Sequence, residues 1–210
     1  WREESTPPQI VGLSSGMASP DEFARRHGLQ LFRSEERPVE LRKGALALES
    51  GIIRWFQDNK EEELPLAIAP EESVGPYLDS LLREFETPAL LFVPTRYQVR
   101  QFAQEIVANR RNSAVPSGEI AVENDNDGTA LGALLKELLP WGVGIHSAEM
   151  TRQQRRLVED RLQQGALDVC VCTSTLAEGI NVGTRTVLVV PPNQPSDGFS
   201  LESLFGRAGR

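Results

Sequence analysis

From residue 88 onward, short uninterrupted apolar runs alternate with amphipathic stretches, and this alternation constrains the fold more than any other feature of the chain. A continuous apolar run is typical of a parallel strand that is buried on both faces. Strands are predicted over residues 89–93, 142–145, 168–172 and 186–190. Helices are predicted over residues 97–110, 131–139 and 152–164. Since helices of this length join parallel strands by right-handed crossovers, the sequence predicts an α/β fold with a parallel sheet flanked by helices.

The first 87 residues have a less regular pattern. Ser19 and Pro20 are typical of a helix start, and Gly28 is typical of a helix end. The other elements predicted here are a buried strand at 10–13, short strands and a connector at 29–49, a polar helix at 50–64 and a helix at 71–86.

The formal net charge of −8 argues against a nucleic-acid partner, but the acidic residues are unevenly placed. Residues 1–139 hold 15 Lys and Arg against 23 Asp and Glu, whereas residues 140–210 hold seven of each. A protein can bind a nucleic-acid backbone with a local basic strip, so overall acidity lowers this expectation without excluding it.

Two cysteines, Cys170 and Cys172, alternate within one predicted strand. Their side chains should point to opposite faces, which disfavours both a disulfide and a shared metal. The acidic run at 124–128 lacks the glutamate that an EF-hand calcium loop requires. Buried free thiols fit a reducing compartment, and no run has the length of a membrane span or the pattern of a signal peptide. The sequence therefore predicts an intracellular protein, cytoplasmic or nuclear, with no metal site of its own and no membrane partner.

Hydroxyl and guanidinium groups occur just after three of the predicted strands. Thr95 and Arg96 follow the first strand, Ser147 follows the second, and Thr173 and Ser174 follow the third. In open parallel sheets, ligands bind at the carboxyl ends of the strands. We therefore expect these residues to share one functional edge.

Two further segments carry groups suited to phosphates. In residues 206–210, Arg207 and Arg210 lie three apart among small residues, and two such guanidiniums can each make bidentate contacts with phosphate oxygens. In residues 173–181, Gly179 permits a close approach of the backbone and Asn181 can bind a sugar hydroxyl. Taken alone, residues 173–181 fit a Ser- and Thr-rich turn equally well.

In their order and spacing, these two segments resemble motifs V and VI of superfamily 2 helicases. Over essentially its whole length, the chain is similar to the superkiller-like branch of the DExH helicases. Four further segments and one residue resemble the family pattern: 13–17 (motif III), 37–39 (the interdomain connector), 91–96 (motif IV), 146–150 (His-His-Ala-Gly-Leu in the family) and Arg155.

The resemblance implies a RecA-like fold of the P-loop NTPase type and an ATP-dependent helicase that moves along single-stranded RNA or DNA. It implies three regions: the end of a first RecA-like domain (1–28), a connector (29–50) and a second RecA-like domain (51–210). Arg207 and Arg210 would contact ATP as catalytic residues, with Gly179 and Asn181 on the nucleotide side. The backbone-binding residues would be Thr95, Arg96, Ser147, Thr173 and Ser174. Ser14 and Gly16 would couple hydrolysis to strand separation.

The chain also departs from the family pattern. Gly16 stands where motif III has a threonine, which puts unwinding in more doubt than hydrolysis. No Gly-x-x-x-x-Gly-Lys-[Ser/Thr] loop and no Asp-Glu magnesium box occur, so the resemblance implies that the Mg²⁺ ligands lie in a preceding domain and that this segment alone is inactive. Two alternatives stay open: a catalytically silent nucleic-acid clamp or protein-docking scaffold, and a duplex translocase that does not unwind.

Overall fold

The computed structural model of the chain describes residues 11–12, 19–33, 40–47, 49–57, 60–65, 74–112, 128–173, 183–191, 204 and 208. It divides into two compact units, Trp1–Arg37 and Pro38–Arg210.

The first unit contains helix α1 (Pro20–His27), as the sequence predicts. Proline occupies its first turn, and Gly28 ends it in the left-handed conformation with φ of 62°. The predicted buried strand at 10–13 is wrong where the structure describes it, because Val11 is 71% exposed and belongs to no strand. A strand is buried only by neighbouring strands or helices, and in the described residues of this unit the regular structure is α1 alone.

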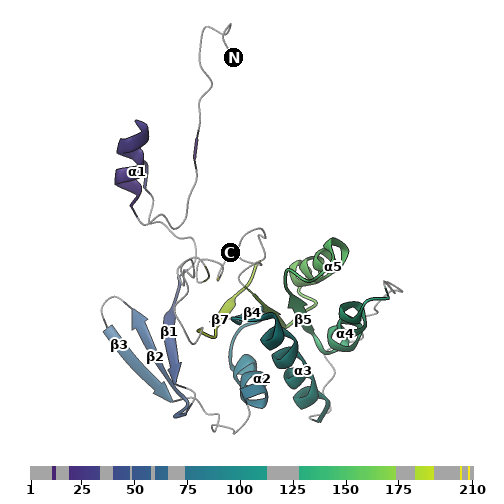
Figure 1. Cartoon of the computed structure of the whole chain (residues 1–210). Coiled ribbons are helices and arrows are strands. Elements are labelled where there is room, and N and C mark those ends of the chain that lie inside the picture. The colour runs from purple at the N-terminus through teal and green to yellow at the C-terminus, as the bar shows by residue number, and fades with distance from the viewer. Residues whose placement is uncertain are drawn as a thin grey trace, which may run out of the picture. The chain divides into compact units, whose positions relative to one another are not determined.

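The second unit begins with a three-stranded antiparallel sheet in the order β1-β2-β3 (Figure 1). Its strands are β1 (Lys43–Ala47), β2 (Ile52–Gln57) and β3 (Lys60–Pro65). The predicted polar helix at 50–64 is therefore wrong. Strand β2 is rich in β-branched and aromatic residues, which suit a pleated surface, and its Arg54 binds Glu63 directly opposite with Nη2–Oε1 at 2.6 Å. Glu61, Glu62 and Glu63, which fall within the predicted polar helix, thus lie on the outer strand of a hairpin.

The main sheet has four parallel strands in the order β5-β6-β4-β7, which confirms the predicted fold class (Figure 1). The strands are β4 (Ala89–Phe92), β5 (Val143–His146), β6 (Val169–Cys172) and β7 (Thr186–Val189). The helices are α2 (Val74–Glu84), α3 (Arg96–Asn112), α4 (Ala130–Leu138) and α5 (Arg152–Gln163), with a 3₁₀ turn at Leu139–Trp141.

The helices cover both faces of this sheet. The connection from β4 to β5 passes over β6 through α3 and α4, and the connection through α5 returns in the opposite direction. Right-handed crossovers in opposite directions place α3 and α4 on one face and α5 on the other. Helix α2 packs beside α3 (Figure 1). Neither set of helices therefore lies across the carboxyl ends of the strands in the described part of the chain.

The core confirms the predicted pattern of burial. Every residue of β4, β5 and β6 is buried, and so is the predicted apolar stripe of α3: Val99, Phe102, Ala103, Ile106 and Val107. Cys170 and Cys172 are buried and unbridged, as expected. Burial raises the pKa of both thiols well above the ordinary value, so both are protonated and unreactive.

A buried cluster of charges connects α2, α3 and the start of β6. The guanidinium of Arg110 donates to Asp79 Oδ1 at 2.7 Å, to Asp168 Oδ2 at 2.8 Å and to the Trp141 carbonyl at 2.5 Å. Asp79 is fully buried and also accepts from Asn109 at 2.9 Å. The cluster fixes the helices on the face opposite α5.

Candidate functional site

The carboxyl ends of the four strands lie in register at one edge of the main sheet. Phe92 pairs with Cys172 and with Val189, and His146 pairs with Cys172. The ladder continues one residue further, because the Thr173 N–H donates to the His146 carbonyl at 3.2 Å. The segments after β4, β5 and β6 therefore begin side by side, as the sequence analysis expects.

Thr95 is exposed at this edge, but its polar groups already have partners. Its hydroxyl donates to Gln98 Oε1 at 2.9 Å and accepts from the Gln98 N–H at 3.2 Å, while its own N–H donates to Gln98 Oε1 at 3.2 Å. This reciprocal pattern is a capping box that begins α3. Thr95 must release Gln98 before its hydroxyl can donate to a phosphate.

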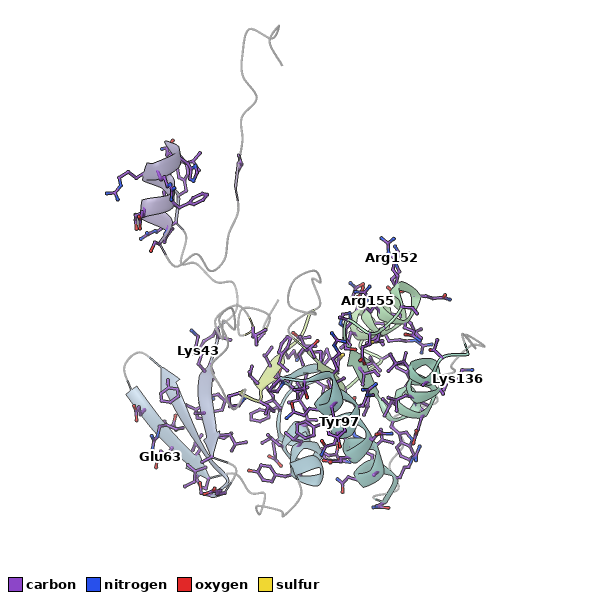
Figure 2. All side chains as sticks on the ribbon, in the orientation of Figure 1. Lys43, Glu63, Tyr97, Lys136, Arg152 and Arg155 are labelled. Carbon is purple, nitrogen blue, oxygen red and sulfur yellow. The ribbon has the colours of Figure 1, made fainter. Side chains whose placement is uncertain are left out.

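Arg96 lies at the start of α3 with its side chain 57% exposed, next to Tyr97, which is 69% exposed (Figure 2). One turn further along the helix lies Arg100. Glu149, in the turn after β5, is close to both arginines: Arg96 Nη1 is 3.5 Å from Oε1, and Arg100 Nη1 is 3.3 Å from Oε2. The sequence analysis missed Arg100 and the acidic partner, although a spacing of four residues in a helix is the signal for a second arginine on the same face.

Ser147 is placed at the edge but is buried, with 3% of its surface exposed. Its N–H donates to Met150 Sδ at 3.4 Å, and its carbonyl accepts from the Met150 N–H at 3.2 Å. These contacts close a tight turn in which Ser147 supports the backbone. Thr173, which is partly exposed, is more accessible than Ser147.

His146 is buried below this turn and binds Glu159 of α5, with Nε2 and Oε1 3.1 Å apart. Burial lowers the pKa of His146, the nearby Arg155 lowers it further, and the bond to Glu159 opposes both effects. Figure 2 shows Arg155 on α5. The imidazole is therefore neutral near pH 7, with its proton on Nε2 facing the carboxylate, and its buried Nδ1 has no hydrogen-bond partner among the described residues.

The remaining predicted site residues lie outside the described residues: Ser14, Gly16, Ser174, Gly179, Asn181, Arg207 and Arg210. Their flanking positions, however, are described. Thr184, three positions after Asn181, forms a parallel β-bridge with Ala208, which stands between the two arginines in sequence. Both bridge residues are buried. The bridge thus pairs the middle residue of segment 206–210 with a position just after segment 173–181.

Beside this bridge is a cavity of about 860 Å³. It lies between the three-stranded sheet and the start of β7, with Ala208 in its wall, and its lining includes Trp55 of β2 and Arg42, the residue before β1. The guanidinium of Arg42 lies over the Trp55 ring, 4.5 Å from its centroid. Nowhere in the described ranges do His, Cys, Asp or Glu side chains gather as metal ligands, and no helix there is long and apolar enough to cross a membrane.

Comparisons with known proteins agree with the resemblance seen in the sequence. Residues 120–210 match the family model described as the helicase conserved C-terminal domain. The chain is 31% identical over 215 residues to the ATP-dependent DNA helicase Hel308 of Pyrococcus horikoshii, covering 96% of the chain and 28% of that protein. It is 38% identical to mouse DNA polymerase theta, covering 96% of the chain and 9% of the relative.

An RNA helicase is also among the relatives. The chain is 29% identical to the DExH-box ATP-dependent RNA helicase DExH13 of Arabidopsis thaliana, covering 96% of the chain and 10% of that protein. Among solved structures, the Mycobacterium smegmatis helicase Lhr, in a complex with ssDNA and AMP-PNP, is similar with a TM-score of 0.44 and 22% identity, covering 64% of the chain and 14% of that protein. The chain spans 28% of the length of the Hel308 protein from P. horikoshii. Over residues 120–210 it thus resembles helicase C-terminal domains, and over nearly its whole length it is similar to ATP-dependent helicases.

Proposed function

We propose that the chain is the second RecA-like motor domain, with the end of the first, of an ATP-dependent nucleic-acid helicase that moves along a single strand and unwinds duplexes. The observation that carries this proposal is the edge of the main sheet, where Arg96 and Thr173 come from neighbouring strand ends. The family match of residues 120–210 supports the same assignment. The protein would act inside the cell, in the cytoplasm or nucleus, together with the preceding RecA-like domain.

In this proposal, the exposed edge holds the backbone of one strand. Arg96 is the main contact because it is charged and exposed, and Thr173 is the second contact. Thr95 contributes less because its hydroxyl caps α3, and Ser147 contributes least because it is buried. Ser174 would extend the contact. Backbone contacts of this kind bind all base sequences with similar affinity.

ATP would bind on the side of Gly179, Asn181, Arg207 and Arg210, with Mg²⁺ held by the preceding domain. The pairing of Thr184 with Ala208 supports this placement, because Ala208 lies between the two arginines and Thr184 follows Asn181 by three positions. When bound, ATP supplies the phosphoryl group whose transfer drives the cycle. The role of Arg207 and Arg210 is to bind and orient phosphate oxygens.

Arg210→Ala in the natural protein tests the motor assignment. In this proposal Arg210 is an arginine finger, a guanidinium that stabilises the charge on the transferred phosphoryl group. Such a residue contributes about three to five orders of magnitude to the rate of phosphoryl transfer, so Arg210→Ala should abolish most of the turnover while ATP affinity falls far less. Arg210→Lys should restore little, since an ammonium does not reproduce the planar guanidinium. The measurements are steady-state ATPase activity at saturating single-stranded DNA and equilibrium nucleotide binding. Near-normal turnover of Arg210→Ala would refute the assignment.

A second candidate function is a silent clamp or docking scaffold with the same fold. Gly16, where motif III has a threonine, favours a chain that does not unwind, and both this scaffold and a duplex translocase meet that condition. An ATPase assay of the natural protein, with RNA, single-stranded DNA and duplex DNA compared in parallel, separates the two functions. Stimulation by a single strand supports the motor, stimulation by duplex alone supports a translocase that does not unwind, and no hydrolysis under any condition supports the scaffold.

A further inference from the structure

The turn after β5 places one carboxylate against two arginines of α3. Glu149 lies 3.5 Å from Arg96 and 3.3 Å from Arg100, measured between the nearest charged atoms. The carboxylate is only 31% exposed, whereas the arginines are 57% and 44% exposed. The arrangement has the geometry of an anion site between two guanidiniums, with a side chain of the protein itself as the anion.

Both sides of this contact are held in position by their own local structure. The Ser147–Met150 hydrogen bonds close the turn, and the buried Met150 anchors it in the core. The capping box of Gln98 with the residue before Arg96 fixes the first turn of α3. Glu149 therefore faces the arginines as part of the folded structure and not as a long side chain that meets them by chance.

The charges at this site compete with any bound phosphodiester. Two arginines four residues apart on a helix repel each other, and an anion between them relieves the repulsion. An exposed ion pair contributes about 0–1 kcal/mol, so a nucleic-acid phosphate can displace the carboxylate. The displaced carboxylate nevertheless stays attached to a short turn, close to the incoming negative charge.

We propose that Arg100 is a second backbone-phosphate contact beside Arg96, and that Glu149 is a built-in competitor that weakens binding of single-stranded nucleic acid at this pair. The inference rests on the proposed function, because it assigns the ligand of the same edge. It predicts that the carboxylate of Glu149 lowers the affinity of the chain for single-stranded nucleic acid.

The test is Glu149→Gln in the natural protein, measured by fluorescence anisotropy with labelled oligothymidylate and oligouridylate of roughly 20 nucleotides over a series of KCl concentrations. Affinity at low salt should rise about three- to tenfold, since loss of one carboxylate leaves one unit of positive charge at the arginine pair available to a phosphate. The plot of log affinity against log salt should steepen by about 0.7, the value for one additional phosphate contact on a single strand. Glu137→Gln is the matched control: it removes an equal charge from an exposed ion pair that joins α4 to Arg111 of α3, and it should leave affinity and slope unchanged.

A second set of variants keeps the inference separate from the proposed function. Arg100→Ala should weaken binding more in the Glu149→Gln background than in the wild type. In that background Arg100 has lost its carboxylate partner, so its charge contributes more to binding the strand. The inference is overturned if Arg96→Ala weakens binding but Glu149→Gln, like Glu137→Gln, leaves affinity unchanged. In that case the sheet edge is still the nucleic-acid site, and Glu149 does not compete at it. If Arg96→Ala, Arg100→Ala and Glu149→Gln all leave binding unchanged, the edge itself is not the nucleic-acid site and both proposals fall. Thermal unfolding of each variant checks that the fold is retained.

Discussion

Replacement of Arg110 by methionine should destabilise the chain severely, because it leaves a buried carboxylate without its main partner. Arg110 is 5% exposed and donates to two carboxylates and one carbonyl at 2.5–2.8 Å. Breaking a buried ion pair from one side costs about 3–5 kcal/mol. Asp79 would keep its bonds from Asn109 at 2.9 Å and from Arg83 at 3.3 Å, so we expect the lower end of this range, about 3 kcal/mol. Methionine preserves most of the side-chain volume, which limits the contribution of a cavity.

The neighbouring residue is a matched control. Arg111 carries the same charge, is about half exposed and pairs with Glu137 at 3.2 Å, so Arg111→Met should cost less than about 1 kcal/mol. Urea unfolding, followed by circular dichroism, gives both values. In an Arg110→Met background, Asp79→Asn should restore part of the loss, because it removes the buried charge. Equal stability of Arg110→Met and Arg111→Met would refute the argument that Arg110 compensates the buried carboxylate.

Two smaller predictions concern the sheet. Burial lowers the pKa of His146 below the ordinary value near 6.5, so the unfolded chain binds this proton more readily and stability should fall as the pH drops below about 6.5. His146→Gln should therefore make the free energy of unfolding less dependent on pH in this window. His27→Gln, at an exposed position, is the control and should leave that dependence as it is. Identical pH profiles for the two variants would contradict the predicted loss of stability at low pH. A Cβ added to Gly144 would lie 2.8 Å from a Leu167 methyl, so Gly144→Ala should cost about 1–3 kcal/mol in urea unfolding. Gly12→Ala, where a Cβ meets nothing within 4 Å, should be near neutral, and similar losses for both would exclude overpacking as the cause.

The parallel sheet could be predicted because its strands are apolar along their whole length. The apolar run at 89–93 is too short for a helix and has no polar face, so burial on both sides is its simplest interpretation. The hairpin could not be predicted as easily. Glu61, Glu62 and Glu63 resemble a solvated helix face, and the antiparallel pairing of β3 with β2 shows that they lie on a strand. Arg54 binds Glu63 from directly opposite, nine residues earlier in the chain. When the partner of a charged residue is distant in the chain, the local sequence pattern predicts its secondary structure poorly.

Some features of the candidate site could likewise be predicted from the sequence, and others could not. The ends of the strands are visible in the sequence, and Arg96 was placed at the edge from that signal alone. The capping box of Thr95 and Gln98 was not predicted, although it has the same spacing as the capping box of Thr151 and Gln154 that begins α5. The contact between Arg96 and Glu149 was not visible in the sequence, because 53 positions separate them and no periodicity connects a helix start to a turn on another strand.

The charge of the whole chain is therefore a poor measure of its affinity for nucleic acid. At physiological salt, exposed charges more than about 8 Å apart are largely screened, so most of the excess acidic residues have little effect on a phosphate at the sheet edge. Glu149 is different, because it lies within 3.5 Å of the same guanidiniums that would bind that phosphate. One carboxylate in contact with the site should thus alter binding more than several distant ones. On this view, the net charge of −8 hardly bears on whether the edge binds a strand, while a single position in the turn after β5 sets how tightly it does so.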